Sequence, residues 1–192
     1  MIYFLYIILK IKLLGGKMSF NCVKKVENDY DKYVLVSTTG KINLPDYLDK
    51  KSKDLAKAVI EKNEFTAKAS EKLAMTLVNN KKVIDFVIVG LGDKAKLNCK
   101  NIRQYLFDTL KNETGKVLLS FANEELDNMD IVAEVVEHIN YKFDKYISKK
   151  KDKFLEVSYL TDKKVPKLIE GYELAKISNI VKDLINEQAE VM

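Results

Sequence analysis

The chain has 192 residues, of which 47% are apolar and 32% are charged, and its formal net charge is +5. This content of apolar residues is enough to form a buried core and excludes an intrinsically disordered chain. Nearly all of the positive charge is lysine, with Arg103 as the single arginine, and because arginine is the better residue for bidentate contacts to phosphate and guanine, the composition argues against a nucleic-acid-binding protein.

The cysteines and the histidine do not suggest a structural metal site. Cys22 and Cys99 lie far apart in the sequence, and His138 is the single histidine. These three residues cannot supply the four ligands of a structural zinc ion unless carboxylates join them. We therefore interpret the cysteines as reduced thiols of a cytoplasmic protein.

The first 17 residues contain the most apolar stretch of the chain, residues 1–14. This stretch is shorter than the roughly 20 residues that cross a bilayer. No basic residue precedes it, and no A-x-A cleavage site follows it, as a secretory signal would require. The sequence Gly15-Gly16-Lys17-Met18 is what a ribosome-binding site and start codon would encode if translated. We therefore interpret residues 1–17 as a translated leader outside the fold, with a membrane anchor or export signal as the alternative.

Strand-like and helix-like patterns alternate after the leader. Runs rich in β-branched and aromatic residues predict strands at 19–26 and 33–37. A helix is expected over 46–62, because Leu55 and other apolar residues recur at helical spacing, and Asp46 is its expected N-terminal cap.

The middle of the chain continues this alternation. Two strands are predicted at 71–78 and 83–89, and the second is almost wholly apolar, as in a strand covered on both faces. Asn98 is the expected cap of a helix that ends near residue 112, and a further buried strand is predicted over 116–121.

The last third predicts a helix over 126–140, a strand over 153–159 and a long helix from about residue 164. Gly171 lies inside the last helix, where glycine costs about 1 kcal/mol relative to alanine, so this helix must be stabilised by packing. The alternation as a whole predicts an α/β sandwich with a mixed or largely parallel sheet.

The segment Gly90-Leu91-Gly92-Asp93-Lys94-Ala95 fits the glycine pattern of dinucleotide-binding turns. In such sites the helix begins at the glycines, so that its amides meet the pyrophosphate. Here the expected cap, Asn98, comes several residues later, and Asp93 places negative charge where phosphate would lie. We therefore interpret the segment as a tight turn after a buried strand, where only glycine fits.

Two polar groups of residues are candidate functional sites. The first group is acidic. Because carboxylates near the N-terminus of a helix interact favourably with the helix dipole, we interpret this group as the start of a helix and not as a metal site. The aromatic and lysine group could stack nucleic-acid bases, but it is more typical of a loop packed on the sheet beside solvated lysines. His138 is expected to serve at a helix C-terminus. The acidic group is Glu124, Glu125, Asp127 and Asp130, and the second group is Tyr141, Phe143 and Tyr146 with Lys149, Lys150 and Lys151.

No GxSxG, HExxH or Walker-type motif is present, so the sequence identifies no catalytic, cofactor-binding or metal-binding residue.

Three stretches, in this order, resemble the N-terminal region of the leucyl aminopeptidase (cytosol aminopeptidase) family. The first is the strand and turn VIVGLG at 87–92, followed by Ile102-Arg103; the second is YKFDKY at 141–146; the third is NIVKDLINEQAEVM at 179–192. The third resembles the family's N-x-x-R-D-L-V-N-E-P-A-N-V-M-T-P run. It departs from that run at Lys182, Gln188 and Glu190, and without the proline the helix can continue further.

This resemblance implies a macro-domain-like three-layer sandwich at 18–162. It also implies a junction helix, at 163–192, that leads to a catalytic domain outside this chain. That domain would carry two divalent metals (zinc, manganese or magnesium), remove N-terminal amino acids from peptides and assemble into hexamers. None of the family's catalytic or metal-binding residues falls within the chain, so these residues alone are expected to be inactive.

The expected role is structural: to position the catalytic domain, to contribute oligomer contacts and to restrict access to the active site. Neither nucleic acid nor a membrane is an expected partner. The alternatives are a free-standing module that binds ADP-ribose or a related nucleotide, and a membrane-tethered interaction protein that depends on residues 1–14.

Overall fold

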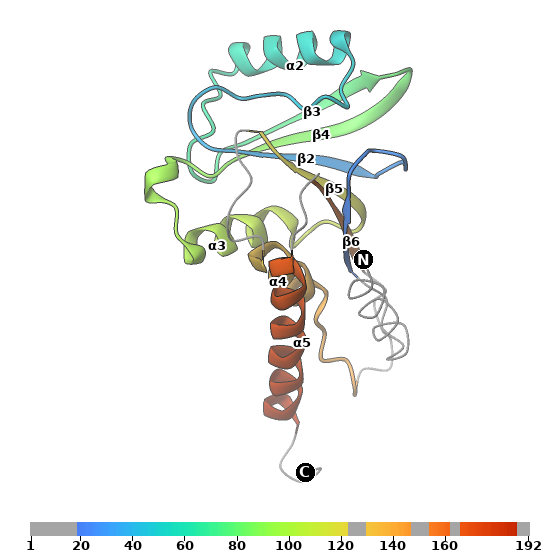
Figure 1. The fold of residues 1–192 in the computed structure, drawn as a ribbon, viewed down its shortest axis with the longest axis vertical. Helices are drawn as coiled ribbons and strands as arrows, with labels where there is room; N and C mark the ends of the chain where they lie inside the picture. The colour runs from blue at the N-terminus through green and yellow to red at the C-terminus, as the bar shows by residue number, and fades with distance from the viewer. Residues whose placement is uncertain (1–18, 123–129, 147–153, 162–165, 188–192) are drawn as a thin grey trace.

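The computed structural model describes residues 19–122, 130–146, 154–161 and 166–187. Within them, six strands form one sheet in the order β1-β6-β5-β2-β4-β3 (Figure 1). Neighbouring strands are parallel except for the antiparallel pair of β3 and β4. The strands are β1 (Phe20–Val23), β2 (Lys32–Ser37), β3 (Lys72–Asn79), β4 (Lys82–Gly90), β5 (Gly115–Phe121) and β6 (Leu155–Leu160).

Helices cover both faces of the sheet, which gives three layers. Helix α2 (Lys50–Lys62) lies on one face, and α3 (Cys99–Leu110), α4 (Asp130–Asn140) and α5 (Pro166–Asn186) lie on the other (Figure 1). A separate apolar cluster fills the space between the sheet and each helical layer. The expected α/β sandwich with a mixed, largely parallel sheet is confirmed.

Strand β2 shows why the centre of the sheet must be apolar on both sides. Tyr33 and Leu35 point into the cluster beneath α2, whereas Val34 and Val36 point into the cluster beneath α3 and α4. All four are buried, because the side chains of a strand alternate between the two faces.

The polar segment between β3 and β4 is a two-residue hairpin turn. Asn80 and Lys81 both have positive φ, 49° and 67°. This is the backbone that a tight hairpin matching the twist of its strands requires.

Helix α2 starts later than expected, at Lys50 and not at residue 46. The cap is Asp49 and not Asp46: the Asp49 carboxylate accepts hydrogen bonds from the amides of Ser52, at 2.8 Å, and of Asn80, at 2.7 Å. Asp49 therefore ties the helix to the hairpin turn, whereas Asp46 forms an exposed ion pair with Lys53. Leu55 is exposed, because the helix turns small residues toward the sheet, namely Ser52 and Ala56.

Other boundaries agree more closely. Asn98 caps α3, and its side chain accepts a hydrogen bond from the amide of Asn101 at 2.9 Å. Strand β1 is shorter than the predicted 19–26. Helix α4 is described from Asp130, so the start of the predicted helix at 126–129 lies outside the described residues.

The glycine inside α5 is explained by a contact with α4. A Cβ atom at Gly171 would lie 2.1 Å from the carbonyl oxygen of Asp130. The neighbouring Tyr172 and Ala175 are buried in the same contact region. The N-terminal half of α5 is therefore part of the domain and not a detached linker.

We expect Gly171→Ala to lower the free energy of unfolding by about 2 kcal/mol, because the methyl group meets backbone that cannot move aside. This loss outweighs the higher helix propensity of alanine. Glu173→Ala, at an exposed position of the same helix, is the control and should change stability by less than about 0.5 kcal/mol. Urea unfolding of both variants measures the difference, and equal stability of the two would show that the helices do not approach this closely.

Candidate functional site

The glycine turn after β4 uses its amides inside the chain. The amide of Gly90 donates to the carbonyl of Glu71 at 2.8 Å, and that of Gly92 donates to the carbonyl of Ala67 at 3.0 Å. The amide of Leu91 bonds the carbonyl at the end of β2. These three donors, which a phosphate cradle would point at its ligand, instead join β4 to neighbouring segments.

Steric limits explain both glycines. A Cβ atom at Gly90 would lie 2.2 Å from the carbonyl oxygen of Lys68, and Gly92 has φ +81°. Asp93 caps only a short 3-10 turn, and α3 begins after Asn98. The geometry is that of the tight turn inferred from the sequence, in which only glycine fits.

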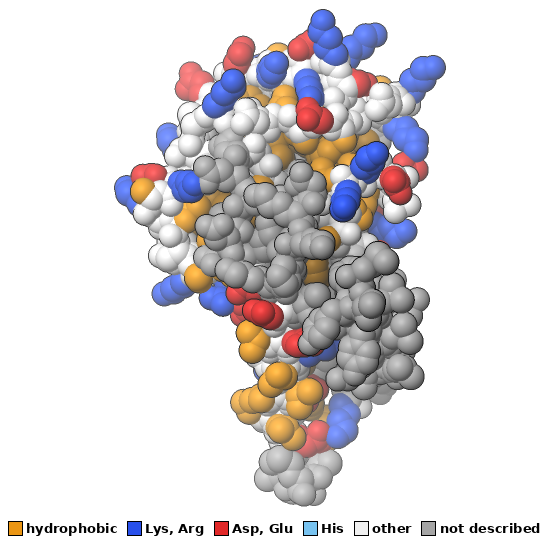
Figure 2. Space-filling view, viewed as in Figure 1, with side chains coloured by type: hydrophobic (Ala, Val, Ile, Leu, Met, Phe, Trp, Pro, Cys, Tyr) orange, Lys and Arg blue, Asp and Glu red, His pale blue; other side chains and the backbone are white. Residues whose placement is uncertain are grey.

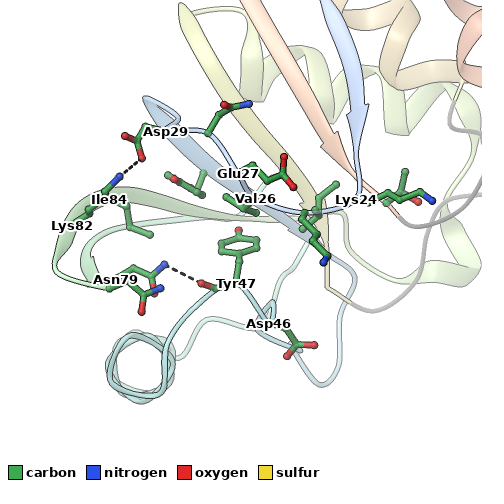
Figure 3. Close-up of a pocket in the computed structure, with 15 residues that line it drawn as sticks. Lys24, Val26, Glu27, Asp29, Asp46, Tyr47, Asn79, Lys82 and Ile84 are labelled. Atoms are coloured by element: carbon green, nitrogen blue, oxygen red, sulfur yellow. Dashed lines mark hydrogen bonds and ion pairs between the residues drawn. The ribbon is translucent and has the colours of Figure 1, made fainter. Parts of the chain in front are cut away.

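A polar cleft lies between the hairpin turn and the loop that follows β1 (Figure 3). The ring of Tyr47 stands in it, and burial raises the pKa of this tyrosine above its ordinary value. The side-chain amide of Asn79 donates to the carbonyl of Tyr47 at 3.0 Å, and Lys82 pairs with Asp29 at 2.6 Å. The first contact ties the hairpin to the segment before α2, and the second ties it to the loop after β1.

The part of the chain that the structure describes contains no group of three or more His, Cys, Asp or Glu side chains close enough to hold a metal ion. Glu124, Glu125 and Asp127 of the acidic group lie outside the described residues, as do Lys149–Lys151. Cys22 and Cys99 are exposed thiols on separate elements. Helices long and apolar enough to cross a membrane are absent from the described residues.

The segment at 141–146 contacts the C-terminal half of α5, so two of the stretches that resemble the aminopeptidase family touch each other. The hydroxyl of Tyr141 donates to the Asp183 carboxylate at 2.9 Å. Lys145 pairs with Glu187 at 2.8 Å, and the hydroxyl of Tyr146 donates to the same carboxylate. The hydrogen bond from Lys145 is the main cause that holds the pKa of Glu187 below its ordinary value. We call these five residues the clamp.

A second set of polar contacts joins α5 to the last turn of α4. Lys182 lies 2.9 Å from Nδ1 of His138 and 3.2 Å from Oδ1 of Asn179, and its Nζ sits 5.0 Å from the centre of the Tyr141 ring. Nδ1 of His138 is also 3.1 Å from Oδ1 of Asn179. His138 therefore does lie at the C-terminal end of a helix, where its contacts connect that helix to its neighbour.

The opposite side of α5 is apolar and exposed. Side chains spaced three and four residues apart fall on one side of a helix, and Leu174, Ile177, Val181 and Leu184 follow this spacing. Figure 2 shows hydrophobic side chains gathered on the projecting end of the molecule. We call this surface the outward face of α5; its residues, with their exposed fractions, are Leu174 (63%), Ile177 (60%), Ile180 (59%), Val181 (47%), Leu184 (58%) and Ile185 (76%).

The sequence did not predict these surfaces; it named Tyr141 and Tyr146 only as candidates for base stacking or for packing a loop on the sheet. It noted the apolar periodicity of the last helix and the isolated stretch at 141–146, but nothing in their spacing indicated that Asp183 and Glu187 would meet Tyr141 and Lys145. The resemblance of both stretches to one family was the available signal that they act together.

Residues 34–150 match the model of the cytosol aminopeptidase family, N-terminal domain. The chain belongs to this family. A probable cytosol aminopeptidase of Fusobacterium nucleatum is 75% identical over 175 residues, which are 91% of this chain and 37% of the relative. Another, of Aquifex aeolicus, is 30% identical over 157 residues, or 76% of this chain and 31% of that protein. This N-terminal domain thus spans about a third of the length of these relatives.

Solved structures agree on the fold of this family member. A mutant of tomato leucine aminopeptidase superposes with a TM-score of 0.63 at 13% identity, over 92% of this chain and 40% of the other. The bottromycin maturation enzyme BotP superposes with a TM-score of 0.60 at 18% identity, over 84% of this chain and 34% of the other. At these identities the likeness establishes the fold alone.

We expect Tyr141→Phe to loosen the end of α5, because the Asp183 carboxylate loses its donor. Hydrogen exchange of the amides at 182–187 should become severalfold faster, while that of the first turns of α5 stays unchanged. Tyr30→Phe, in the loop before β2, is the control and should leave α5 as it is. Unchanged exchange in Tyr141→Phe would mean that the clamp does not hold the helix.

Proposed function

We propose that this chain is the non-catalytic N-terminal domain of a two-metal leucyl aminopeptidase, an enzyme that removes N-terminal amino acids from peptides. Its role is to position the metal-bearing domain through the outward face of α5. The proposal assigns the chemistry to the part of such an enzyme that lies outside the matched region, which is about two thirds of the length of the relatives. When bound there, two divalent metals would supply a nucleophilic water and polarise the scissile carbonyl.

The observation that carries the proposal is the contrast between the two sides of α5. One side of α5 faces α4 and the clamp and is held there by polar and packing contacts. The other side exposes six large apolar residues. Apolar patches of this kind, rimmed by polar residues, are typical of surfaces that another protein surface covers. The relatives are about three times as long as the matched region. The remaining part of such an enzyme is the partner that would cover this surface.

The clamp gives this surface a defined orientation. Because Asp183 and Glu187 are bound from the side of the 141–146 segment, the helix cannot rotate about its axis without losing both contacts. A partner would therefore meet a preorganised surface, which reduces the entropy lost on docking.

Contributions to hexamer contacts, restriction of access to the active site and a cytoplasmic location complete the proposal. The cytoplasmic location is supported by membership of a family whose relatives are named cytosol aminopeptidases, whereas the hexamer contacts and the restriction of access are what the resemblance to that family implies. The alternative of an ADP-ribose or nucleotide module gains no support from the glycine turn, because its amides bond the chain itself.

The test uses a joined protein, in which this chain precedes the remaining part of the Fusobacterium nucleatum relative. We expect Leu184→Asp to lower the midpoint of thermal unfolding of the joined protein by roughly 4 °C or more, because it places a charge in an apolar interface. In the 192-residue chain alone the same change should cost about 1 kcal/mol or less, since Leu184 is exposed there and the loss is limited to helix propensity and the helix dipole.

The matched control is Leu55→Asp on α2, an exposed leucine on the other face of the sheet. It should affect the chain alone and the joined protein equally. If Leu184→Asp also affects both equally, the outward face of α5 is not the docking surface.

A further inference from the structure

A groove with an apolar floor and a cationic rim lies between α3 and α5. Its floor is formed by Phe107 of α3 and Val135 of α4. Its rim carries Lys100 and Arg103 of α3 on one side and Lys182 of α5 on the other. Phe107 remains 39% exposed, so the floor is open to a side chain from outside.

The groove has an excess of positive charge. The residues described as lining it include three permanent cations and no carboxylate. Glu134 lies nearby, but it is bound by the Arg103 guanidinium at 2.8 Å. Lys182 is directed at His138 and Asn179, neither of which carries a negative charge. Such a concentration of like charge favours an anionic partner.

The groove and the outward face of α5 share an edge. Lys182 follows Val181 directly and precedes Ile185 by one helical turn, and both of these apolar residues belong to the outward face. A protein that covers the outward face therefore also meets the rim of the groove.

We propose that the groove receives an acidic segment of the polypeptide that docks on the outward face of α5. An apolar side chain of that segment packs on Phe107, and its carboxylates pair with Lys100 and Lys182. The exposed ring of Phe107 favours a protein segment over a small anion, because a small anion would leave that ring uncovered. This inference rests on the proposed function, since the segment belongs to the same metal-bearing part of the enzyme.

In this arrangement the two surfaces have different tasks. The apolar face contributes most of the stabilisation, since burial of apolar area is the dominant favourable term in association. The charged groove selects the register in which the two parts meet, because charge complementarity gives specificity and speed more than affinity.

The experiment places a photo-reactive benzoylphenylalanine at Gln104, which lines the groove, in the joined protein. Irradiation followed by mass spectrometry of the cross-linked peptides identifies what lies there. We expect a peptide that contains several Asp or Glu residues and comes from outside residues 1–192. The same photo-reactive residue at Lys57, on α2, is the control and should give no such peptide.

A charge reversal then tests the electrostatic part. Lys100→Glu should reduce the yield of the cross-link by roughly threefold or more at about 50 mM salt and much less at about 500 mM, because salt screens the rim charges. Lys57→Glu should leave the yield unchanged at both salt concentrations.

Four results would overturn the inference: a cross-linked peptide without carboxylates, a peptide from a second copy of this chain, RNA at the cross-link, or no cross-link. Equal yields for Lys100→Glu and Lys57→Glu would also do so. The behaviour of Leu184→Asp separates the two proposals. If Leu184→Asp destabilises the joined protein while the cross-link fails, the docking face stands and the groove has another role.

Discussion

Helix α5 crosses the start of α4 so closely at Gly171 that a methyl group there would lie 2.1 Å from the carbonyl oxygen of Asp130. This approach allows Tyr172 and Ala175 to enter the core. It also sets the direction in which the rest of the helix leaves the sheet. Every surface of functional interest in the C-terminal part of the domain, including the outward face and the edge of the cationic groove, depends on that direction.

From this contact onward the two sides of α5 have different partners. The inward side is bound by residues of α4 and by the clamp, through hydrogen bonds and ion pairs that are individually weak. The outward side carries a group of exposed apolar residues of a kind that is uncommon on monomeric domains. A helix that is held on one side and apolar on the other is suited to join two domains, because it presents an interface without having to fold during docking.

The sequence predicted the layers of the fold well, because strand and helix periodicities are strong in this chain. It identified the turn at Gly90 and Gly92 and the cap at Asn98, since each depends on local chemistry. It failed for α2, where Asp46 was expected to cap the helix; Asp49 does so because it also binds the hairpin turn, which is a tertiary contact. The clamp was beyond prediction for the same reason: segments about 40 residues apart meet only once α4 and α5 have packed.

The exposure of individual side chains on α5 tests the central claim most directly. Hydroxyl-radical footprinting measures how readily Ile177 and Leu184 are oxidised in the chain alone and in the joined protein. Domain docking on the outward face predicts severalfold slower oxidation of both residues in the joined protein, with Val83 on the hairpin unchanged. Equal oxidation rates in the two proteins would contradict the account.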